Sequence, residues 1–241
     1  MATKFTQALS PYDIFTCSSD AKLELGTEGV TPDGRRFRYV KAGSTATVAG
    51  KLYQSRAEDA TNWENIAIAA ASAGATSIVT TGTITAAKDL FAGGWVVIAD
   101  DTGEGYFYKV KGNTAATAAV CTIYLEDPLV EAITTSTTID VIPHIYGSVE
   151  IWDATNHDGV PVGVAVSDIT ANYYGWVQVG GICNVLCNGT GAVGMLAVAS
   201  NAVDGSVEPA AGGSTEAFAP IGVWATGVTD TEYGAVMLNL N

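Results

Sequence analysis

Residues Gly93 to Lys111 have the sequence GGWVVIADDTGEGYFYKVK. Two runs rich in Val, Ile and aromatic residues, 94–99 and 105–111, flank the turn sequence Asp101-Thr102-Gly103. β-branched and aromatic side chains suit a pleated sheet, and glycine permits the positive φ of a tight turn. The stretch therefore predicts a β-hairpin, the unit from which a mainly β fold is assembled.

The same pattern of short strand and turn recurs along the chain. Similar runs, bounded by Gly, Asp, Asn or Pro, occupy 35–40, 46–53, 77–81, 118–125, 138–142, 147–152, 161–166, 174–179, 182–187, 193–198, 221–226 and 233–240. Regularly spaced short strands of this kind are typical of β-sandwiches and barrels. We predict a mainly β fold of short-stranded β-barrel or sandwich domains, with an extended N-terminal arm and little helix.

Composition divides the chain into four parts. Residues 1–34 form the predicted N-terminal arm, and 35–74 combine strands with an Ala-rich connector. Residues 75–145 form a small inserted β-domain, and 146–241, rich in Gly, Val and Ala, form a C-terminal β-barrel or sandwich domain. Strand order leads to the hypothesis that 35–53 pairs with the C-terminal barrel across the insertion.

Two segments leave alternatives open. Residues 57–73 favour a helix by propensity, although the alternation Ile66-Ala67-Ile68 also suits a strand. Residues 1–30 are either a frayed terminus or an arm that becomes ordered only against a partner. We favour the arm, because a solvated tail seldom holds so many large apolar residues, here Phe5, Tyr12, Ile14 and Phe15.

Charge is distributed unevenly. The 241 residues contain 11 Lys and Arg against 25 Asp and Glu, a formal net charge of −14. All 11 cations lie between Lys4 and Lys111 alongside 12 carboxylates, whereas 112–241 hold 13 carboxylates and no cation. The acidity argues against nucleic-acid binding, which needs a basic footprint. The uneven distribution of charge has two interpretations. Either the excess of carboxylates keeps copies apart and soluble, or one end of the protein docks onto a partner while the other faces solvent.

The chain has no feature of a membrane protein. No apolar run approaches the roughly 20 residues that span a bilayer. The N-terminal sequence MATKFTQALSPYDIF also lacks the apolar region of a secretion signal. We expect a protein made in the cytoplasm, with no membrane partner.

The most basic segment runs from Arg35 to Lys41, with the sequence RRFRYVK. On a strand, Arg36 and Arg38 would face one way and Arg35 and Lys41 the other. Our hypothesis is that Arg35, Arg36, Arg38 and Lys41 dock onto an acidic protein surface. The alternative is a solvated edge strand that charge protects against aberrant pairing.

Catalytic and metal-binding patterns are weak throughout. Neither histidine, His144 or His157, accompanies a nucleophile motif. Cys183 and Cys187 lack a second ligand pair at zinc spacing, so all four cysteines are expected to be free thiols. The string GTGAVG at 189–194 fits a hairpin turn better than a dinucleotide-binding loop. We expect no enzyme, no cofactor and no metal.

Four aromatic residues form a further candidate site. Tyr173, Tyr174 and Trp176 lie close together in the sequence, and Trp152 lies upstream. They are candidates for a subunit contact or a glycan-facing surface. The alternation in 176–179 fits a half-buried strand better than a sugar platform, with the aromatic rings in a core or a subunit contact.

Much of the chain from about Gly26 resembles structural proteins encoded in the head gene clusters of tailed phages. The stretches that carry the resemblance are DGRRFRYVKAGS (33–44), TVAGKLYQ (47–54), NIAIAAA (65–71), GATSIVT (74–80), AGGWVVI (92–98), GEGYFYKV (103–110) and LEDPL (125–129). The final third is similar to capsid decoration, or cement, proteins, through VGVAV (162–166), YGWVQV (174–179), IGV (221–223) and LNL (238–240).

The resemblance implies a non-enzymatic virion protein that binds the outer surface of the phage capsid lattice and stabilises it. Its partners would be the major capsid protein and further copies of itself, as a homotrimer, and its location the capsid surface. The resemblance implies no particular docking residues.

Two other functions stay open. One is a phage tail or fibre component that binds a receptor or glycan through the aromatic residues. The other is a hydrolase with an acidic site around His157.

Overall fold

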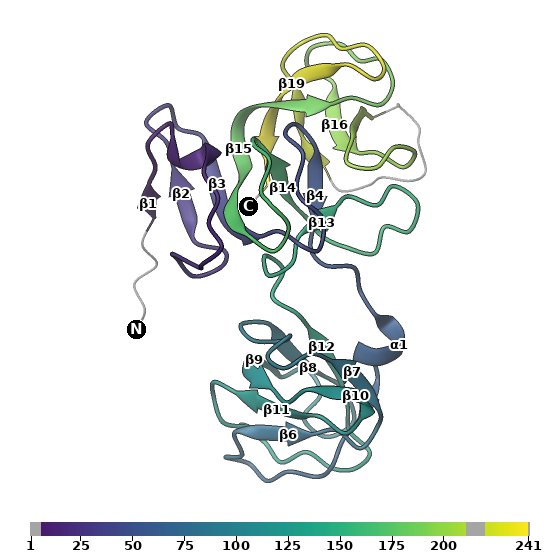
Figure 1. Cartoon of the computed structure of the whole chain (residues 1–241). Helices are drawn as coiled ribbons and strands as arrows, with labels where there is room; N and C mark the ends of the chain where they lie inside the picture. The colour runs from purple at the N-terminus through teal and green to yellow at the C-terminus, as the bar shows by residue number, and fades with distance from the viewer. Residues whose placement is uncertain (1–5, 211–219, 241) are drawn as a thin grey trace. The chain divides into compact units, whose positions relative to one another are not determined.

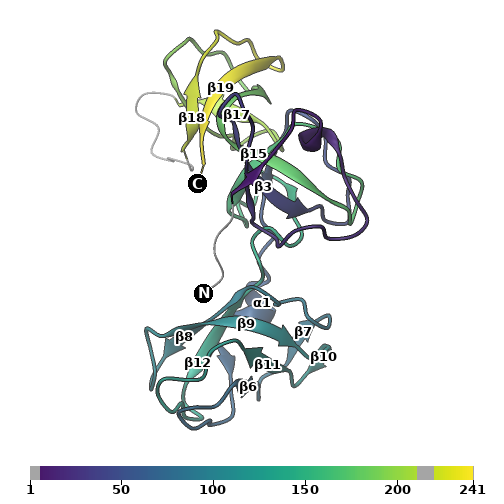
Figure 2. The ribbon, with the colours of Figure 1, turned by 90° about the vertical axis from the view of Figure 1, so that its left-hand side faces the viewer.

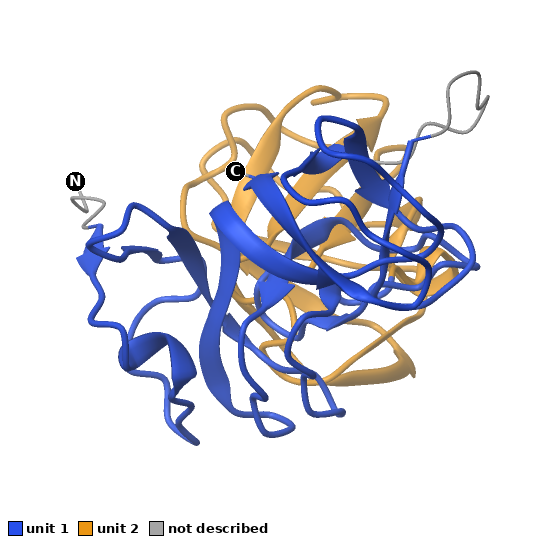
Figure 3. Cartoon of the chain, turned by 90° about the horizontal axis from the view of Figure 1, so that it is seen from above, with its two compact units in different colours: residues 1–57, 145–241 blue, residues 58–144 orange. Residues whose placement is uncertain are grey.

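The computed structural model describes residues 6–210 and 220–240, so Phe5 of the predicted arm lies outside the described residues. The chain is mainly β with little helix, which confirms the predicted fold class. It separates into two compact units (Figure 3). Unit 1 comprises residues 1–57 and 145–241, and unit 2 comprises 58–144. Unit 2 is therefore an insertion between the two parts of unit 1.

Unit 1 is built on one sheet, which has 11 strands over the described residues. Eight of them follow one another across the sheet: β1 (Gln7–Ala8), β2 (Glu28–Val30), β3 (Arg36–Lys41), β15 (Tyr174–Leu186), β19 (Tyr233–Asn239), β18 (Pro220–Trp224), β16 (Leu196–Ala199) and β17 (Val207–Pro209). The other three are β4 (Leu52–Gln54), β13 (Glu150–Ile151) and β14 (Pro161–Ala165). β14 pairs with β15 and β4, and β4 pairs with β13.

The pairing expected of 35–53 with the C-terminal strands is present in the structure. β3 pairs antiparallel with β15, with Tyr39 opposite Trp176. β4 pairs with β13 and β14. Strands on either side of the insertion therefore share one sheet.

β15 links two regions of this sheet (Figures 1 and 2). Its first half pairs with β3 and β14, and its second half pairs with β19. We predicted two strands, 174–179 and 182–187, but the structure has one strand of 13 residues. The chain bends without ending, because Gly181 adopts a φ of +83° and the register with β3 shifts after Gln178.

The N-terminal segment is ordered against its own unit. Its 3-10 helix η1 (Asp13–Phe15) and strands β1 and β2 lie beside β3 (Figure 1). Leu9 and Ile14 are buried in a cluster with Phe37, Tyr39 and Trp176. The expectation of an arm that becomes ordered only against a partner is therefore wrong for residues 6–34. Of the apolar side chains that suggested a partner, Ile14 completes the core of unit 1, whereas Tyr12 and Phe15 are exposed.

Unit 2 contains two sheets over the described residues. In the larger one the order is β5 (Ile66–Ala67), β12 (Thr138–Ile142), β8 (Trp95–Asp100), β9 (Phe107–Asn113), β11 (Thr122–Leu125) and β6 (Ser77–Val79). In the smaller one β7 (Ile84–Ala86) pairs with β10 (Ala116–Ala119). β8 and β9 form the predicted hairpin, with Val96 opposite Tyr108.

The Ala-rich connector belongs to unit 2, which begins at Glu58 and not at residue 75 as predicted. Trp63, Ile66 and Ile68 are buried in the unit 2 core and hold the connector there. The connector contains both a helix and a strand, the two alternatives that the sequence left open. One helical turn, α1 (Ala60–Trp63), begins where the Asp59 carboxylate accepts a hydrogen bond from the Asn62 amide at 3.2 Å, and β5 follows it.

Candidate functional site

A groove of about 400 Å³ lies between the N-terminal segment, β3 and β15. Leu9, Cys17, Lys22, Tyr39, Tyr174 and Trp176 are among the residues that line it. We call the surface around this groove, formed by residues 6–23 with β3 and the first half of β15, the N-terminal face. It brings together two of the predicted aromatic residues and places Lys41 beside them.

Three aromatic rings form the floor of the groove. Tyr39 and Tyr174 stack with their ring centroids 6.1 Å apart, and Trp176 meets Tyr39 edge to face at 5.1 Å. The Tyr39 hydroxyl accepts a hydrogen bond from the Lys22 amide at 3.1 Å. Tyr39 and Trp176 are buried, so these rings support the groove from below and do not form an exposed platform.

The other two predicted aromatic residues lie elsewhere. Trp152 is buried in a different core cluster, where its indole nitrogen donates to the Ser200 carbonyl at 2.7 Å. Tyr173 is partly exposed, and its carbonyl accepts from the Ala42 amide. Trp152 and Trp176 complete two separate cores, so neither forms a glycan-facing surface, and the burial of Trp176 agrees with the half-buried strand favoured for 176–179.

The four cations of the basic segment also separate. Arg38 is largely buried, and its guanidinium lies 3.5 Å from the Glu28 carboxylate and donates to the Gly26 carbonyl at 3.2 Å. It ties β3 to the neighbouring segment, which leaves it unsuited to docking. Lys41 lies 5.7 Å above the Tyr174 ring, at the N-terminal face.

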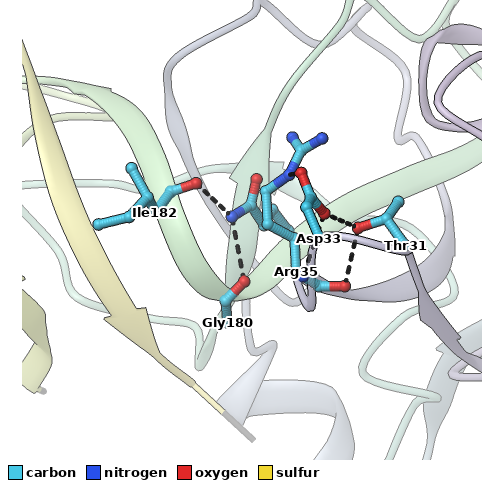
Figure 4. A network of polar contacts seen from close by, with 6 residues as sticks. Thr31, Asp33, Arg35, Gly180 and Ile182 are labelled. Atoms are coloured by element: carbon cyan, nitrogen blue, oxygen red, sulfur yellow. Dashed lines mark hydrogen bonds and ion pairs between the residues drawn. The ribbon is translucent and has the colours of Figure 1, made fainter.

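Arg35 belongs to the turn between β2 and β3 (Figure 4). Its Nε donates to the Asp33 carboxylate at 2.8 Å, and Thr31 also donates to that carboxylate. These hydrogen bonds, first from Thr31 and then from Arg35, hold the pKa of Asp33 below its usual value. Arg36 points the other way and lies against Gly180, where a Cβ would come within 2.6 Å of its Nε.

The N-terminal face also presents residues that the basic segment did not indicate. Tyr12 is 81% exposed and Phe15 is 58% exposed, both at η1. Lys22 is exposed and lines the groove. In the sequence, Tyr12 and Phe15 stood out only because large apolar residues are unusual in a solvated tail. Nothing in the sequence singled out Lys22, because its position at the groove depends on how residues 6–23 fold back onto β3 and β15.

A second pocket, of about 360 Å³, contains the acidic residues around His157. Each of its three aspartates is engaged in a turn or a side-chain contact: Asp153 accepts from the Thr155 and Asn156 amides, Asp158 from Gln54 and Asp204 from the Ala154 amide. Hydrogen bonds, the largest from Asn156, hold the pKa of Asp153 below its usual value. The His157 ring lies 5.7 Å from that of Trp152. These three carboxylates therefore act as hydrogen-bond acceptors that hold the local turns and the Gln54 side chain.

Cys121, Cys183 and Cys187 are buried and Cys17 is exposed, all as free thiols. Over residues 6–210 and 220–240, no three His, Cys, Asp or Glu side chains are grouped so as to hold a metal ion. Among the helices of the same residues, none has the length and apolar character needed to cross a bilayer.

Unit 2 carries an exposed aromatic pair of its own. Trp95 on β8 is 39% exposed and Phe107 on β9 is 61% exposed. Their ring centroids lie 5.0 Å apart, at an interplanar angle of 53°. Ile142 on β12 lies opposite Trp95 and is also exposed. This pair, and not Trp152 or Trp176, is available to a ligand in solution.

Comparison with known proteins adds no identification: no protein-family model, no curated protein and no solved structure matches the chain.

Proposed function

We propose that the chain is a non-enzymatic virion structural protein that binds the outer surface of a phage capsid lattice and stabilises it. Its partner is the major capsid protein, and its N-terminal face is the docking surface. The proposal rests on the sequence resemblance and on the uneven distribution of charge between the two parts of the chain that form unit 1.

All the cations of unit 1 come from the part of the chain before the insertion. Residues 1–57 hold eight Lys and Arg against five Asp and Glu, whereas 145–241 hold nine Asp and Glu and no cation. The β3–β15 pairing joins both parts in one sheet. An acidic partner surface attracts residues 1–57, which hold all the cations of unit 1, and repels residues 145–241, which hold only carboxylates.

Docking through the N-terminal face combines charge with apolar anchors. Lys22 and Lys41 supply positive charge beside the groove, and the exposed rings of Tyr12 and Phe15 supply contact area. Tyrosine is among the residues that most often dominate binding energy, and both tyrosine and phenylalanine are enriched at interfaces. On a lattice, several modest contacts of this kind act together, because tethering raises the effective concentration of each further contact.

The test is binding to expanded capsids that lack the protein. Purified chain is added, the capsids are sedimented and the bound copies are counted against capsid subunits. The double variant Lys22→Glu/Lys41→Glu is expected to bind roughly tenfold or more weakly, most clearly at low salt. Lys88→Glu/Lys111→Glu in unit 2 makes the same change in charge and should bind like the wild type.

Failure of the wild-type chain to bind expanded capsids of its own phage would reject the proposed function. Equal weakening by both double variants would keep capsid binding but reject the N-terminal face as its site.

A second candidate function is a tail or fibre component that binds a glycan. The exposed Trp95–Phe107 pair favours it, since sugar rings pack on exposed aromatic faces. Glycan-array binding that Trp95→Ala abolishes would support this function. Trp176→Ala is a poor test, because Trp176 is buried and its loss would disturb the core.

A further inference from the structure

The six-stranded sheet of unit 2 closes on itself. Ile68, which follows β5, forms a β-bridge with Thr80, which follows β6, and β5 and β6 are the two edge strands of the sheet. A closed sheet has one side toward its core and one side toward its surroundings. Val96, Tyr108 and Val141 are buried in the core, so the residues that alternate with them on β8, β9 and β12 point outward.

Outward residues of β12, β8 and β9 form two rows in register, each with one ionised residue at its end. Across these strands in turn, the rows consist of Ile142, Trp95 and Lys109, and of Asp140, Val97 and Phe107. Residues directly opposite one another in antiparallel strands point to the same side of the sheet. We call the surface of these two rows the aromatic face, because it presents the exposed Trp95 and Phe107 rings, with centroids 5.0 Å apart.

Ionised side chains beside the rings supply hydrogen-bond donors and acceptors. The Lys109 ammonium lies 3.5 Å from the Glu126 carboxylate, and both side chains are 44% exposed. The pair therefore offers a donor and an acceptor whose charges offset each other. Asp140 is partly exposed and accepts a hydrogen bond from the Asn65 amide at 2.8 Å. A carboxylate has about four lone-pair sites, so Asp140 keeps the capacity to accept from a ligand as well.

We propose that the aromatic face binds a neutral polysaccharide. The proposal rests on the glycan-binding candidate above, for which it names the class of ligand and the polar contacts, and is independent of capsid docking. One face of a sugar ring carries C–H groups that pack on an aromatic ring, while its hydroxyl groups both donate and accept hydrogen bonds. Neighbouring strands lie about 4.8 Å apart, so a sugar ring on Trp95 has the Lys109–Glu126 pair beside it.

Charge selects a neutral ligand over an acidic one. Unit 2 holds three cations against eleven carboxylates, so it repels a polyanion such as an acidic polysaccharide or a nucleic acid. A protein partner fits the aromatic face poorly, because charged residues are depleted from the core of a protein interface, and here Lys109 and Asp140 lie in the same rows as the rings. Sugar hydroxyl groups satisfy such ionised neighbours by hydrogen bonding.

The test is affinity electrophoresis of the full chain, with no capsid present. Native gels contain mannan, dextran or a soluble β-glucan as the neutral polymer, or alginate as the acidic one. The wild-type chain is expected to be retarded by at least one neutral polymer and not by alginate. Retardation at a series of polymer concentrations gives the dissociation constant, which moderate salt should leave nearly unchanged because the ligand carries no charge.

Trp95→Ala is expected to raise this dissociation constant roughly tenfold or more, because it removes the ring on which the sugar packs. Tyr12→Ala is the matched control: it removes an exposed ring from unit 1, and should weaken capsid binding but leave polysaccharide binding unchanged. Circular dichroism verifies that each variant is folded. If Trp95→Ala does not fold, Phe107→Ala takes its place, since Phe107 is 61% exposed.

Lys109→Met tests the polar contacts separately. It keeps the apolar stem of the side chain and removes the ammonium donor, so the dissociation constant is expected to rise about threefold to tenfold. Lys88→Met is its control in the same unit and should leave the constant unchanged, because Lys88 lies outside the two rows and its side chain is 78% exposed. Equal constants for the two variants would reject Lys109 as a contact of the ligand.

A wild-type chain that no neutral polymer retards overturns the proposal. So does retention of binding by both Trp95→Ala and Phe107→Ala, or equal weakening by Tyr12→Ala. If the chain still binds an acidic glycan, whether alginate or a glycan on an array, the glycan-binding candidate stands without the neutral ligand. If it binds no glycan at all, both fail. Capsid binding is measured by sedimentation, so none of these outcomes decides the first proposed function.

Discussion

Arg38 and Lys41 lie three residues apart, yet only one of them is available to a partner. The Arg38 guanidinium is occupied by Glu28 and the Gly26 carbonyl, whereas the Lys41 ammonium lies over the Tyr174 ring at the N-terminal face. Breaking a largely buried ion pair leaves a charge without its partner. Arg38 therefore stabilises unit 1 through Glu28 and is not available to bind another protein. At this scale, the neighbours of a side chain decide whether its charge serves stability or binding.

The thiols provide a prediction at the same scale. Burial raises the pKa of Cys183 to about 12 and that of Cys187 to about 11, and Cys121 is buried as well. Because the thiolate is the reactive form, only the exposed Cys17 is expected to react quickly with a disulfide reagent at pH 8. The measurement is one fast thiol per native chain and three more after denaturation. Cys17→Ser should remove the fast phase, and a second fast thiol would contradict the prediction.

The same pKa shifts fix a pH dependence of stability. The folded chain holds the Cys183 and Cys187 protons more tightly than the unfolded chain, whose thiols titrate near the ordinary value of 9.0. The unfolded state therefore loses these protons first, and the free energy of unfolding falls as the pH rises above about 9.

At the scale of the element, β15 determines how unit 1 is built. The strand bends at Gly180-Gly181, so it pairs with β3 before the bend and with β19 after it. The Gln178 amide spans the bend and donates to the carbonyls of Gly180 and Ile182 at 3.0 and 2.9 Å, shown as dashed lines in Figure 4. The bend lets one continuous strand form part of the N-terminal face and also pair with β19.

Gln178→Leu is expected to weaken this bend. Gln178 is fully buried, so the substitution leaves the buried Gly180 carbonyl and the partly buried Ile182 carbonyl without this donor and lowers the free energy of unfolding by about 1–3 kcal/mol. Urea unfolding measures the loss. The control, Gln7→Leu, alters an exposed glutamine and should change stability little. Equal stability of the two variants would show that Gln178 does not hold the bend.

At the scale of the whole molecule, two units with separate cores share one chain. The unit 2 core is built around residues such as Phe91, and that of unit 1 around residues such as Ile169, both fully buried. Net charge differs little between them: unit 2 holds three cations and eleven carboxylates, and unit 1 holds eight cations and fourteen carboxylates. The uneven distribution of charge therefore lies within unit 1, between the part of the chain before the insertion and the part after it.

Separate cores predict separate unfolding. Phe91→Ala is expected to destabilise unit 2 by about 3–5 kcal/mol, the usual cost of removing a buried ring, without weakening unit 1. Hydrogen exchange measures this as protection lost over 58–144 alone. Ile169→Ala is the matched variant, with protection lost in unit 1 instead. Loss of protection across both units with either variant would mean that the chain unfolds as one cooperative block.

Part of the fold of this protein can be predicted from the sequence by itself. The 93–111 hairpin, the mainly β class and the pairing of the segments before and after the insertion follow from alternation, turn residues and strand order. These signals are local, because side-chain alternation and the glycine of a tight turn act within a few residues. The boundary at 58, by contrast, depends on which core receives Trp63 and Ile66.

Only the tertiary structure decided which of the candidate residues reach the surface. The burial of Trp152 and Trp176, the pairing of Arg38 with Glu28 and the alignment of Ile142 with Trp95 all depend on how separate strands come together. A pattern along one strand shows which residues share a side, but not what lies against that side. The register between distant strands supplies that answer, because it determines which side chains meet each other and which meet water.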